Sequence, residues 1–213
     1  MFTGLVTALG RISEVVPLQA GEGSGLRVMV QVPAAWLQGV DLGDSICVSG
    51  ACMTAVELGA AHFAFDISAE SLARTTGLDA AGIEVNLEQS LTLATKLGGH
   101  LVTGHVDGIG QVERFEPAGE SWHLALRAPS GLARFFAYKG SIAVNGVSLT
   151  VNRVTDANDA SASVHINLIP HTLRHTNLHS LKPGSAVNLE VDLIARYVER
   201  MLPGLRADLA ART

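Results

Sequence analysis

The chain has 213 residues and a formal net charge of −5, and only 15 residues are lysine or arginine. This composition argues against nucleic acid as a partner, because proteins that bind a phosphate backbone normally carry a basic patch or stripe. The chain starts without a basic, apolar leader and contains no uncharged apolar stretch of about 20 residues, so we expect a cytoplasmic protein without a membrane partner.

Short β-strands are predicted along the chain, with only brief helices between them. A glycine-rich run at residues 21–25 leads into an alternating strand and not into a helix, so it predicts a hairpin turn and not a phosphate-binding loop. Residues 33–37 and 68–74 are short helical candidates. Period-two alternation predicts strands at residues 26–32, 123–127 and 163–168.

Four sequence blocks occur twice, about 100 residues apart and in the same order. Two copies of a unit this long predict two tandem domains of one fold, at residues 1–98 and 99–192. Together with the strand pattern, the repeat predicts an all-β protein made of two small antiparallel Greek-key β-barrels, each closed or nearly closed. The repeated blocks are residues 3–6 and 103–106, 45–54 and 141–150, 70–75 and 171–176, and 85–88 and 187–190.

The tail at residues 193–213 matches neither repeat. Its apolar residues fall at helical spacing with charged residues on the opposite side, until Pro203 and Gly204 interrupt the pattern. The pattern predicts an amphipathic helix that packs either on its own barrel or against copies of itself in an oligomer. The apolar stripe consists of Leu193, Ile194, Tyr197, Val198, Met201 and Leu202.

The cysteines and one histidine run bear on redox state and metals. Cys47 and Cys52 lie five apart within one strand-rich block, so we expect no disulfide and a reducing, intracellular setting. His171, His175 and His179 are spaced by four, which on one helix would align three imidazoles as in a metal site. Because a proline precedes the run and no carboxylate shares its face, we expect a ligand-contacting short helix there and no metal.

Several long blocks together resemble the signature of riboflavin synthase of the alpha-chain type, a lumazine-binding repeat family. They are residues 1–6 (MFTGLV), 98–108 (GGHLVTGHVDG), 138–151 (YKGSIAVNGVSLTV) and 168–173 (LIPHTL). The resemblance implies a homotrimer of two-barrel chains with a C-terminal helix at residues 193–213, which would serve oligomerisation. It also implies no cofactor and no metal, and lumazine synthase as a possible partner.

The activity that the resemblance implies is a dismutation of 6,7-dimethyl-8-ribityllumazine. One molecule donates a four-carbon unit to another, which gives riboflavin and 5-amino-6-ribitylaminouracil. Two molecules of one substrate require two similar pockets, and tandem barrels supply them. Bringing the two reactants together can contribute roughly 7–11 kcal/mol of the barrier.

Donor and acceptor must behave differently, so positions where the two copies disagree are informative. His105 replaces Leu5, and histidine suits proton transfer near neutral pH. Cys52 is either a nucleophile toward the lumazine ring or a small wall of the pocket. We expect His100, five residues before His105, to be structural. The remaining differences are Ser148 for Cys52, Lys139 for Gly43, and Asp192 for Ser90, and drift between old duplicates is the alternative explanation for each.

The resemblance assigns two sets of site residues. The catalytic candidates are His105, Cys52, Ser148, Thr150 and Asp192. The substrate-binding candidates are Gly4, Leu5, Val6, Ser45, Cys52, Met53, Thr54, Asp66, Ile67, Ser68, Ala69, Glu70 and Ser71 in the first half. In the second half they are Gly104, His105, Val106, Lys139, Ser148, Leu149, Thr150, Leu168, Ile169, Pro170, His171 and Thr172.

The sequence departs from the family pattern in two places. Ser49 and Met53 alter the first-half motif, which puts its turn geometry in doubt, and Gln89 replaces an arginine that would form a surface ion pair.

Two other functions are alternatives to the enzyme. Relatives of the same fold bind lumazine or flavin without catalysis as antenna proteins, so fold alone does not assign activity. Those binders lack the histidine and cysteine motifs as a set. A flavin-binding reductase barrel would need a companion nucleotide domain, for which the chain has no room.

Overall fold

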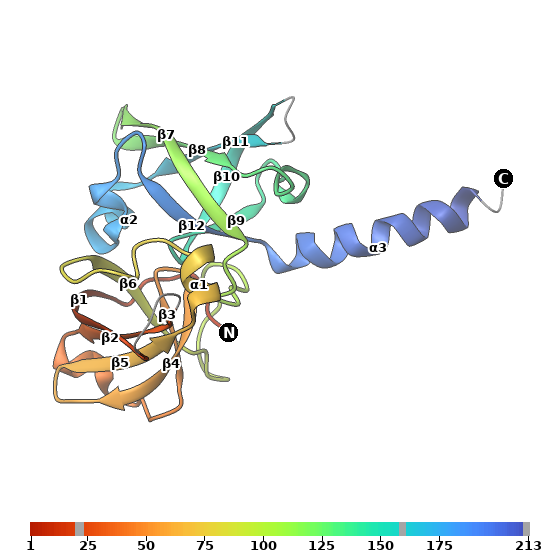
Figure 1. Cartoon of the computed structure of the whole chain (residues 1–213). Coiled ribbons are helices and arrows are strands. Elements are labelled where there is room, and N and C mark those ends of the chain that lie inside the picture. The colour runs from red at the N-terminus through yellow and green to blue at the C-terminus, as the bar shows by residue number, and fades with distance from the viewer. Residues whose placement is uncertain (20–23, 158–160, 211–213) are drawn as a thin grey trace.

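The computed structural model describes residues 1–19, 24–157 and 161–210, with side chains up to residue 202 in the last range. Figure 1 shows two barrels packed against each other, with a long helix extending away from them. The first barrel is built from β1 (Ala8–Pro17), β2 (Leu26–Gln31), β3 (Ser45–Val48), β4 (Ala51–Leu58), β5 (His62–Ile67) and β6 (Glu84–Gln89). The second is built from β7 (Gly108–Ala118), β8 (Ser121–Ala128), β9 (Ser141–Val144), β10 (Val147–Asp156), β11 (Ala162–Leu168) and β12 (Ala186–Val191).

Both barrels are closed and have the same strand order. Neighbouring strands run β1-β2-β5-β4-β3-β6 in the first barrel, and the second repeats this order as β7-β8-β11-β10-β9-β12. All pairs are antiparallel, and the step from β2 to β5 gives the Greek-key connection. The prediction of two like Greek-key barrels is therefore confirmed, as are the three strands predicted from alternation. The predicted turn at residues 21–25 joins β1 to β2, but residues 21–23 lie outside the described residues.

Each barrel buries its own apolar core. In the first, Val28, Val30, Phe63 and Phe65 are fully buried, while Met29 and Gln31, which alternate with them in β2, are more accessible. The second core repeats this arrangement with residues of β8 and β11, among them Leu124, Leu126, Val164 and Ile166. The two-residue period seen in the sequence thus comes from strands with one buried face.

A matching hairpin in each barrel brings the two halves into contact. The turn between β3 and β4 has positive φ at Ser49 (45°) and Gly50 (91°), and the turn between β9 and β10 has the same at Asn145 (46°) and Gly146 (79°). Two positive φ values are typical of a type I′ turn. The tips touch, because a Cβ placed on Gly50 would lie 2.9 Å from the Gly146 nitrogen. The Ser49 departure therefore leaves the turn geometry intact.

Reciprocal asparagine hydrogen bonds join the barrels. The amide group of Asn188 in β12 donates to the carbonyls of Ser49 (2.9 Å) and Thr76 (3.1 Å), and its Oδ1 accepts from the Thr76 N–H (2.8 Å). Asn86, its repeat counterpart in β6, bonds the second barrel in the same way. Its partners are the Asn145 carbonyl (2.9 Å), Asn177 Oδ1 (2.9 Å) and the Asn177 N–H (2.7 Å). Each barrel thus satisfies buried polar groups of the other.

The helices are short except for the last. They are η1 (Ala34–Leu37), α1 (Ala69–Arg74), η2 (Ala133–Phe135), α2 (Pro170–His175), η3 (Asn177–Ser180) and α3 (Leu193–Ala210). The predicted helices at 33–37 and 68–74 are confirmed as η1 and α1. The expected interruption at Pro203 and Gly204 is wrong, because α3 extends to Ala210; a proline removes one backbone hydrogen bond of a helix without always ending it. No helix within the described residues is long and apolar enough to cross a membrane.

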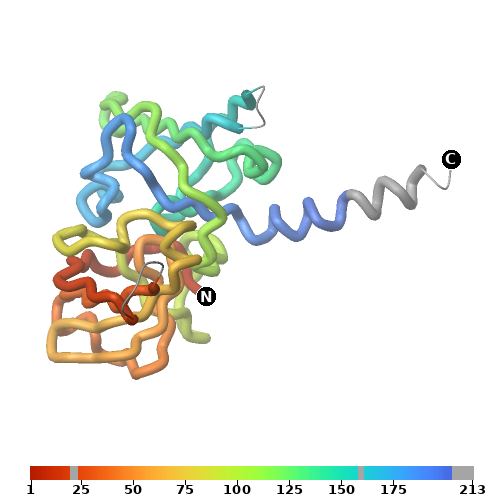
Figure 2. The backbone as a smooth tube through the Cα atoms, viewed as in Figure 1, coloured from red at the N-terminus to blue at the C-terminus, as the bar shows by residue number. Residues whose placement is uncertain are grey.

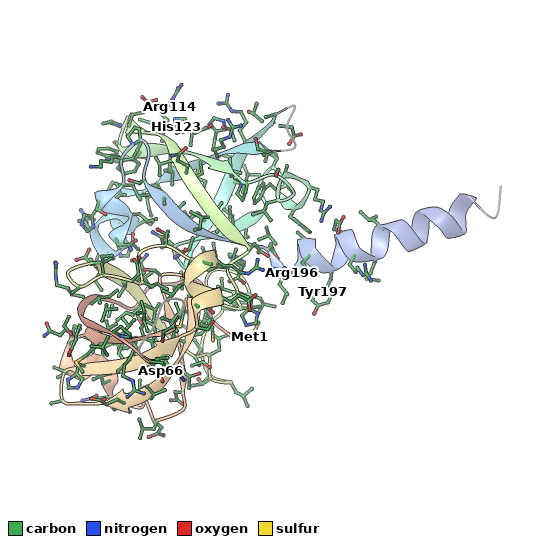
Figure 3. The ribbon with its side chains drawn as sticks, in the orientation of Figure 1. Met1, Asp66, Arg114, His123, Arg196 and Tyr197 are labelled. Carbon is green, nitrogen blue, oxygen red and sulfur yellow. The ribbon has the colours of Figure 1, made fainter. Side chains whose placement is uncertain are left out.

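Helix α3 is fixed to the second barrel over its first two turns. Asp192 caps it by accepting from the Ile194 N–H (2.9 Å), and Arg196 bonds Asp107 at 2.9 Å. Glu199 pairs with Arg134 of η2 at 3.4 Å, and the helix axis points away from the barrels (Figure 2). Tyr197 is 62% exposed and Met201 is 64% exposed. Figure 3 shows Tyr197 on a helix face that neither barrel covers. Ile194, Val198 and Leu202, in contrast, line a cavity that α3 shares with η2.

Replacing Asn188 with alanine should weaken the seam between the barrels. The change leaves the half-buried Thr76 N–H and the carbonyl of the buried Ser49 without their partner, so we expect a loss of about 1–3 kcal/mol in the free energy of unfolding. Denaturant titration measures this. The control is Asn167→Ala, which removes an exposed asparagine whose Oδ1 accepts from Ser121 and should cost less than about 0.5 kcal/mol. Equal effects of the two substitutions would contradict the role of the seam.

Candidate active site

Each half of the chain lends a short segment to the barrel of the other half. The Cys52 N–H in β4 donates to the carbonyl of Gly104 at 2.8 Å, and Val106 packs against the core of the first barrel. Reciprocally, the Ser148 N–H in β10 donates to the carbonyl of Gly4 at 2.8 Å, and Val6 packs against the core of the second barrel. His105 therefore lies at the first barrel, although its sequence repeat belongs to the second.

The two glycines make this close approach possible. Gly4 has φ +73° and Gly104 has φ +79°, a region that favours glycine. A Cβ at Gly4 would lie 2.6 Å from the Ser148 Cβ, and one at Gly104 would lie 2.6 Å from the Cys52 Cβ. Any side chain at either position would push the exchanged segment off the barrel, so the Thr-Gly motif is a packing requirement.

The exchange brings Cys52 and His105 to one cavity of about 200 Å³. Cys52 is half-buried and its thiol is free, while the His105 side chain is exposed. The other residues that line the cavity come from β4, from α1 and the residue after it, and from the exchanged segment; they are Ala51, Met53, Ser71, Arg74, Thr75, Gly104 and Val106. Six predicted site residues of two different repeats, Cys52, Met53, Ser71, Gly104, His105 and Val106, are thus gathered here.

The cysteines themselves are closer than the sequence spacing suggests. Cys47 and Cys52 are direct partners in the β3–β4 register, since the two-residue turn between them folds the block back on itself. Both thiols are free, as expected. Cys47 is buried, and burial strongly raises the pKa of its thiol. The half-buried Cys52 is the one that faces the cavity.

Ser148, which stands where Cys52 does in the repeat, has a different histidine partner. His100 Nδ1 lies 2.6 Å from Ser148 Oγ, and the His100 N–H donates to the Thr3 carbonyl at 3.1 Å. His100 is only 8% exposed, and its Nε2 is buried without a hydrogen-bond partner among the described residues. Burial lowers the pKa of His100, and the Asp192 carboxylate partly opposes this shift. The structural role that we expect for His100 therefore includes direct contact with a candidate catalytic residue.

Lys139 and Asp192 occupy special backbone positions in the second half. Lys139 has φ +63°, the conformation that Gly43 adopts with φ +95° in the first half. Such strain in a non-glycine residue is typical of functional sites. Its Nζ lies 3.4 Å from Asn152 Oδ1 and 5.3 Å from the Tyr138 ring centre. Asp192 caps α3, and its carboxylate also acts electrostatically on His100. It therefore affects a residue of the site as well as the helix.

Other predicted site residues lie beside different cavities or in the cores. Ser45 and Thr54 are register partners on β3 and β4, as Ser141 and Thr150 are on β9 and β10. Ser45 lines a separate cavity of about 200 Å³, and Leu5 lines one of about 480 Å³ near Trp36. The side chains of four candidates are buried in the barrel cores; these are Ile67, Met53, Leu149 and Leu168. Met53 also lines the cavity that holds Cys52.

The two short helices carry the remaining candidates. In the first half, Asp66 is bound to Arg27 by two hydrogen bonds of 2.8 and 3.0 Å, which lower the pKa of its carboxyl. Ser68 caps α1, and Glu70 pairs with Arg74 at 3.4 Å. Ala69 lies in the same helix, and Figure 3 places Asp66 on the first barrel. In the second half, Ile169 is exposed ahead of α2, and Pro170, His171 and Thr172 form its first turn.

The three spaced histidines do not share one helix. His171 and His175 stack in α2 with ring centres 4.1 Å apart, but α2 ends at His175 and His179 lies in η3. The Nδ1 atoms of His175 and His179 lie 2.8 Å from the carbonyls of His171 and Thr176. Within the part of the chain that the structure describes, no group of three metal-binding side chains is found.

Comparison with known proteins gives the family. The lumazine binding domain matches twice, at residues 3–90 and 103–192. Riboflavin synthase of Photobacterium phosphoreum is 39% identical over 203 residues, which cover 95% of this chain and 89% of the relative. Riboflavin synthase of Brucella abortus is 39% identical over 208 residues, which cover 94% of this chain and 98% of the relative. The chain belongs to the riboflavin synthase family.

Solved structures of similar fold contain bound ligands. The crystal structure of LumP complexed with riboflavin has a TM-score of 0.78 at 26% identity, and the match covers 90% of this chain and 99% of that one. LumP complexed with 6,7-dimethyl-8-(1'-D-ribityl)lumazine has a TM-score of 0.76 at the same identity. The match to the riboflavin synthase family extends over both barrels, so the exchanged segments and both hairpins fall within it.

The second departure from the family pattern has a local structural role. Gln89 in β6 donates a hydrogen bond from Nε2 to the Trp36 carbonyl, which ties η1 to the barrel. An amide thus replaces the expected ion pair with a bond to the backbone. Met53, the other altered residue, is buried in the first core.

Protonation of His100 should make stability depend on pH. Because its pKa is lowered in the folded chain, the unfolded chain binds this proton more readily, so stability is full above about pH 6.5 and falls as the pH decreases through the lowered pKa. Urea unfolding of the wild type and His100→Gln between about pH 5 and 7 should show a flatter dependence in the variant. The pKa of His165, which burial also lowers, contributes equally to both proteins. Identical slopes would exclude this role of His100.

Proposed function

We propose that the chain catalyses the dismutation of 6,7-dimethyl-8-ribityllumazine to riboflavin and 5-amino-6-ribitylaminouracil, with no cofactor and no metal, in the cytoplasm. Identity of 34–39% to riboflavin synthases over 95% of the chain carries this proposal. The paired barrels support it, because two molecules of one substrate need two related sites held together. Tandem sites turn their encounter into an effectively intramolecular step.

The roles of the residues follow from their placement. His105 is proposed as the proton-transfer group at the first-barrel cavity, where Cys52 is either a nucleophile or a wall. At the second barrel, Ser148, Thr150, Lys139 and Asp192 are proposed to act on the other substrate molecule. We add His100 to this group because its Nδ1 is 2.6 Å from Ser148 Oγ. The substrate-binding candidates on β3, β4 and the two short helices would contact the rings or the ribityl chains.

A binding protein without catalysis is the alternative function. It is favoured by the similarity to LumP, which was crystallised with riboflavin and with the lumazine. The presence of His105, Cys52 and Ser148 together in this chain favours the enzyme. The two functions differ in turnover, not in ligand affinity.

Purified protein should convert the lumazine to equal amounts of riboflavin and the aminouracil, with a chelator present and no nucleotide added. The reason is that the two substrate molecules exchange a carbon unit between themselves and need no external redox partner. Riboflavin absorbance measures the reaction, and protein denatured by heat is the control. Tight lumazine binding without product would establish the antenna function instead.

Replacing His105 with glutamine should slow turnover by about 10²–10⁴-fold, as expected for a general acid–base group, and leave riboflavin binding largely unchanged. Cys52→Ser should cost less than this if the thiol is a wall, and as much or more if it is a nucleophile. The measurements are kcat and the riboflavin dissociation constant of each variant. Lost binding in His105→Gln, with unchanged turnover of the bound fraction, would reassign His105 to binding.

We propose that helix α3 joins chains into a homotrimer, with the reacting pair between the first barrel of one chain and the second barrel of its neighbour. The exposed stripe on α3 supports this, because a lone chain leaves Ile194, Tyr197 and Met201 more than half exposed. Lumazine synthase is proposed as a partner, since it would supply the substrate.

Ending the chain before Leu193 should yield a monomer, because the truncation removes the whole apolar stripe. The matched control ends after Leu202, which keeps the stripe and should remain a trimer. Light scattering of both truncated chains and the full chain measures their masses. A full-length monomer, or a trimer that survives loss of α3, would refute this assembly.

A further inference from the structure

Glu190 in β12 is a buried carboxylate with both oxygens engaged by the exchanged segment. Its Oε1 accepts from the Thr103 N–H and the Thr103 hydroxyl, each at 2.7 Å. Its Oε2 accepts from the Gly104 N–H at 2.9 Å and the His105 N–H at 3.1 Å. Glu190 is 2% exposed, and burial raises the pKa of its carboxyl while the bonds to Thr103 and Gly104 lower it. Four donors therefore compensate a charge that water cannot reach.

The segment is held from the opposite side by the first barrel. Cys52 donates its N–H to the Gly104 carbonyl, and the Gly104 backbone lies so near Cys52 that no Cβ fits between them. Gly104 is thus fixed between a carboxylate of one barrel and a strand of the other. The side chain of its neighbour His105 makes no hydrogen bond among the described residues. The position of the imidazole therefore depends on the position of the His105 backbone.

We propose that Glu190 is a positioning residue of the reaction: it fixes the backbone of Thr103 to His105 and thereby places the imidazole at the Cys52 cavity. This inference rests on the proposed function, in which His105 transfers protons. General acid–base groups act only within hydrogen-bond reach of the proton they move, and a misplacement of about 1 Å can cost on the order of 10²-fold in rate.

The repeat provides a matched comparison within the same chain. Glu88 in β6 accepts from the Thr3 N–H and hydroxyl, each at 2.6 Å, and from the Gly4 N–H at 2.9 Å. It therefore holds the first exchanged segment against Ser148, and not His105 against Cys52. Loss of either carboxylate should disturb the fold similarly, but only Glu190 acts through His105.

The test is a double-mutant cycle with Glu190→Gln and His105→Gln. Glutamine keeps the shape of Glu190 but turns an N–H₂ group toward N–H donors, so the segment loses part of its anchorage. We expect Glu190→Gln to lower kcat on the order of 10²-fold with little change in riboflavin affinity. In the double variant, kcat should be no lower than in His105→Gln alone, because there is no imidazole left to misplace.

Two further variants separate positioning from folding. Thr103→Val removes a hydroxyl that donates to Glu190 and accepts from the His105 N–H at 3.3 Å, but it leaves the carboxylate in place. It should show a smaller loss of kcat and the same dependence on His105. Glu88→Gln should lower kcat by the same factor whether or not His105 is present. Multiplicative effects of Glu190→Gln and His105→Gln, or of Thr103→Val and His105→Gln, would overturn the inference. A wild-type chain without turnover would refute the proposed function and this inference with it, whereas turnover with multiplicative effects refutes the inference alone.

Discussion

The exchange of hydrogen bonds by Asn86 and Asn188 is the constraint on which the rest of the structure depends. The side-chain amide of each asparagine extends from its own barrel and forms hydrogen bonds with backbone groups of the other half. In either barrel alone, these polar groups would lack their hydrogen-bond partners. A buried polar group without its partner is costly, which makes the relative placement of the barrels as specific as the packing within them. The hairpin tips at Gly50 and Gly146 touch at the same seam and leave no space for adjustment.

The exchanged segments depend on that placement. Gly104 can hydrogen-bond with β4 only if the second barrel stands at a fixed distance from the first, and Gly4 has the same relation to β10. The cavity with Cys52 and His105 is therefore a product of the seam and not of either barrel. Placing a site between domains is common for small ligands. Here the placement also makes one pocket respond to residues of both repeats.

Much of the fold could be predicted from sequence because repetition and alternation are local signals. The strand at 26–32 is visible from one buried face, and the repeated blocks indicate two barrels of one fold. The partnership of His105 with Cys52 is not local, since the repeat alone would place His105 in the second barrel with Ser148. Only the exchange of segments shows that Ser148 pairs with His100 instead, which single-chain spacing placed in a structural role.

The length of helix α3 also differs from what local sequence rules predict. Proline and glycine at 203 and 204 predict an interruption, yet α3 extends through them. The departures from the family motif had structural answers that sequence could not supply. Ser49 adopts the positive φ that Asn145 adopts, and Gln89 bonds a backbone carbonyl.

The seam has the pattern of an isologous interface, in which the same patch meets itself across a two-fold axis. Ser49 and Gly50 face Asn145 and Gly146, and the bonds made by Asn86 are returned by Asn188. Such symmetry is the ordinary outcome when two identical subunits associate, and a tandem chain has no need of it. The two repeats therefore meet as the two subunits of a homodimer would, and they differ at Leu5 and His105 although the contacts between them remain paired.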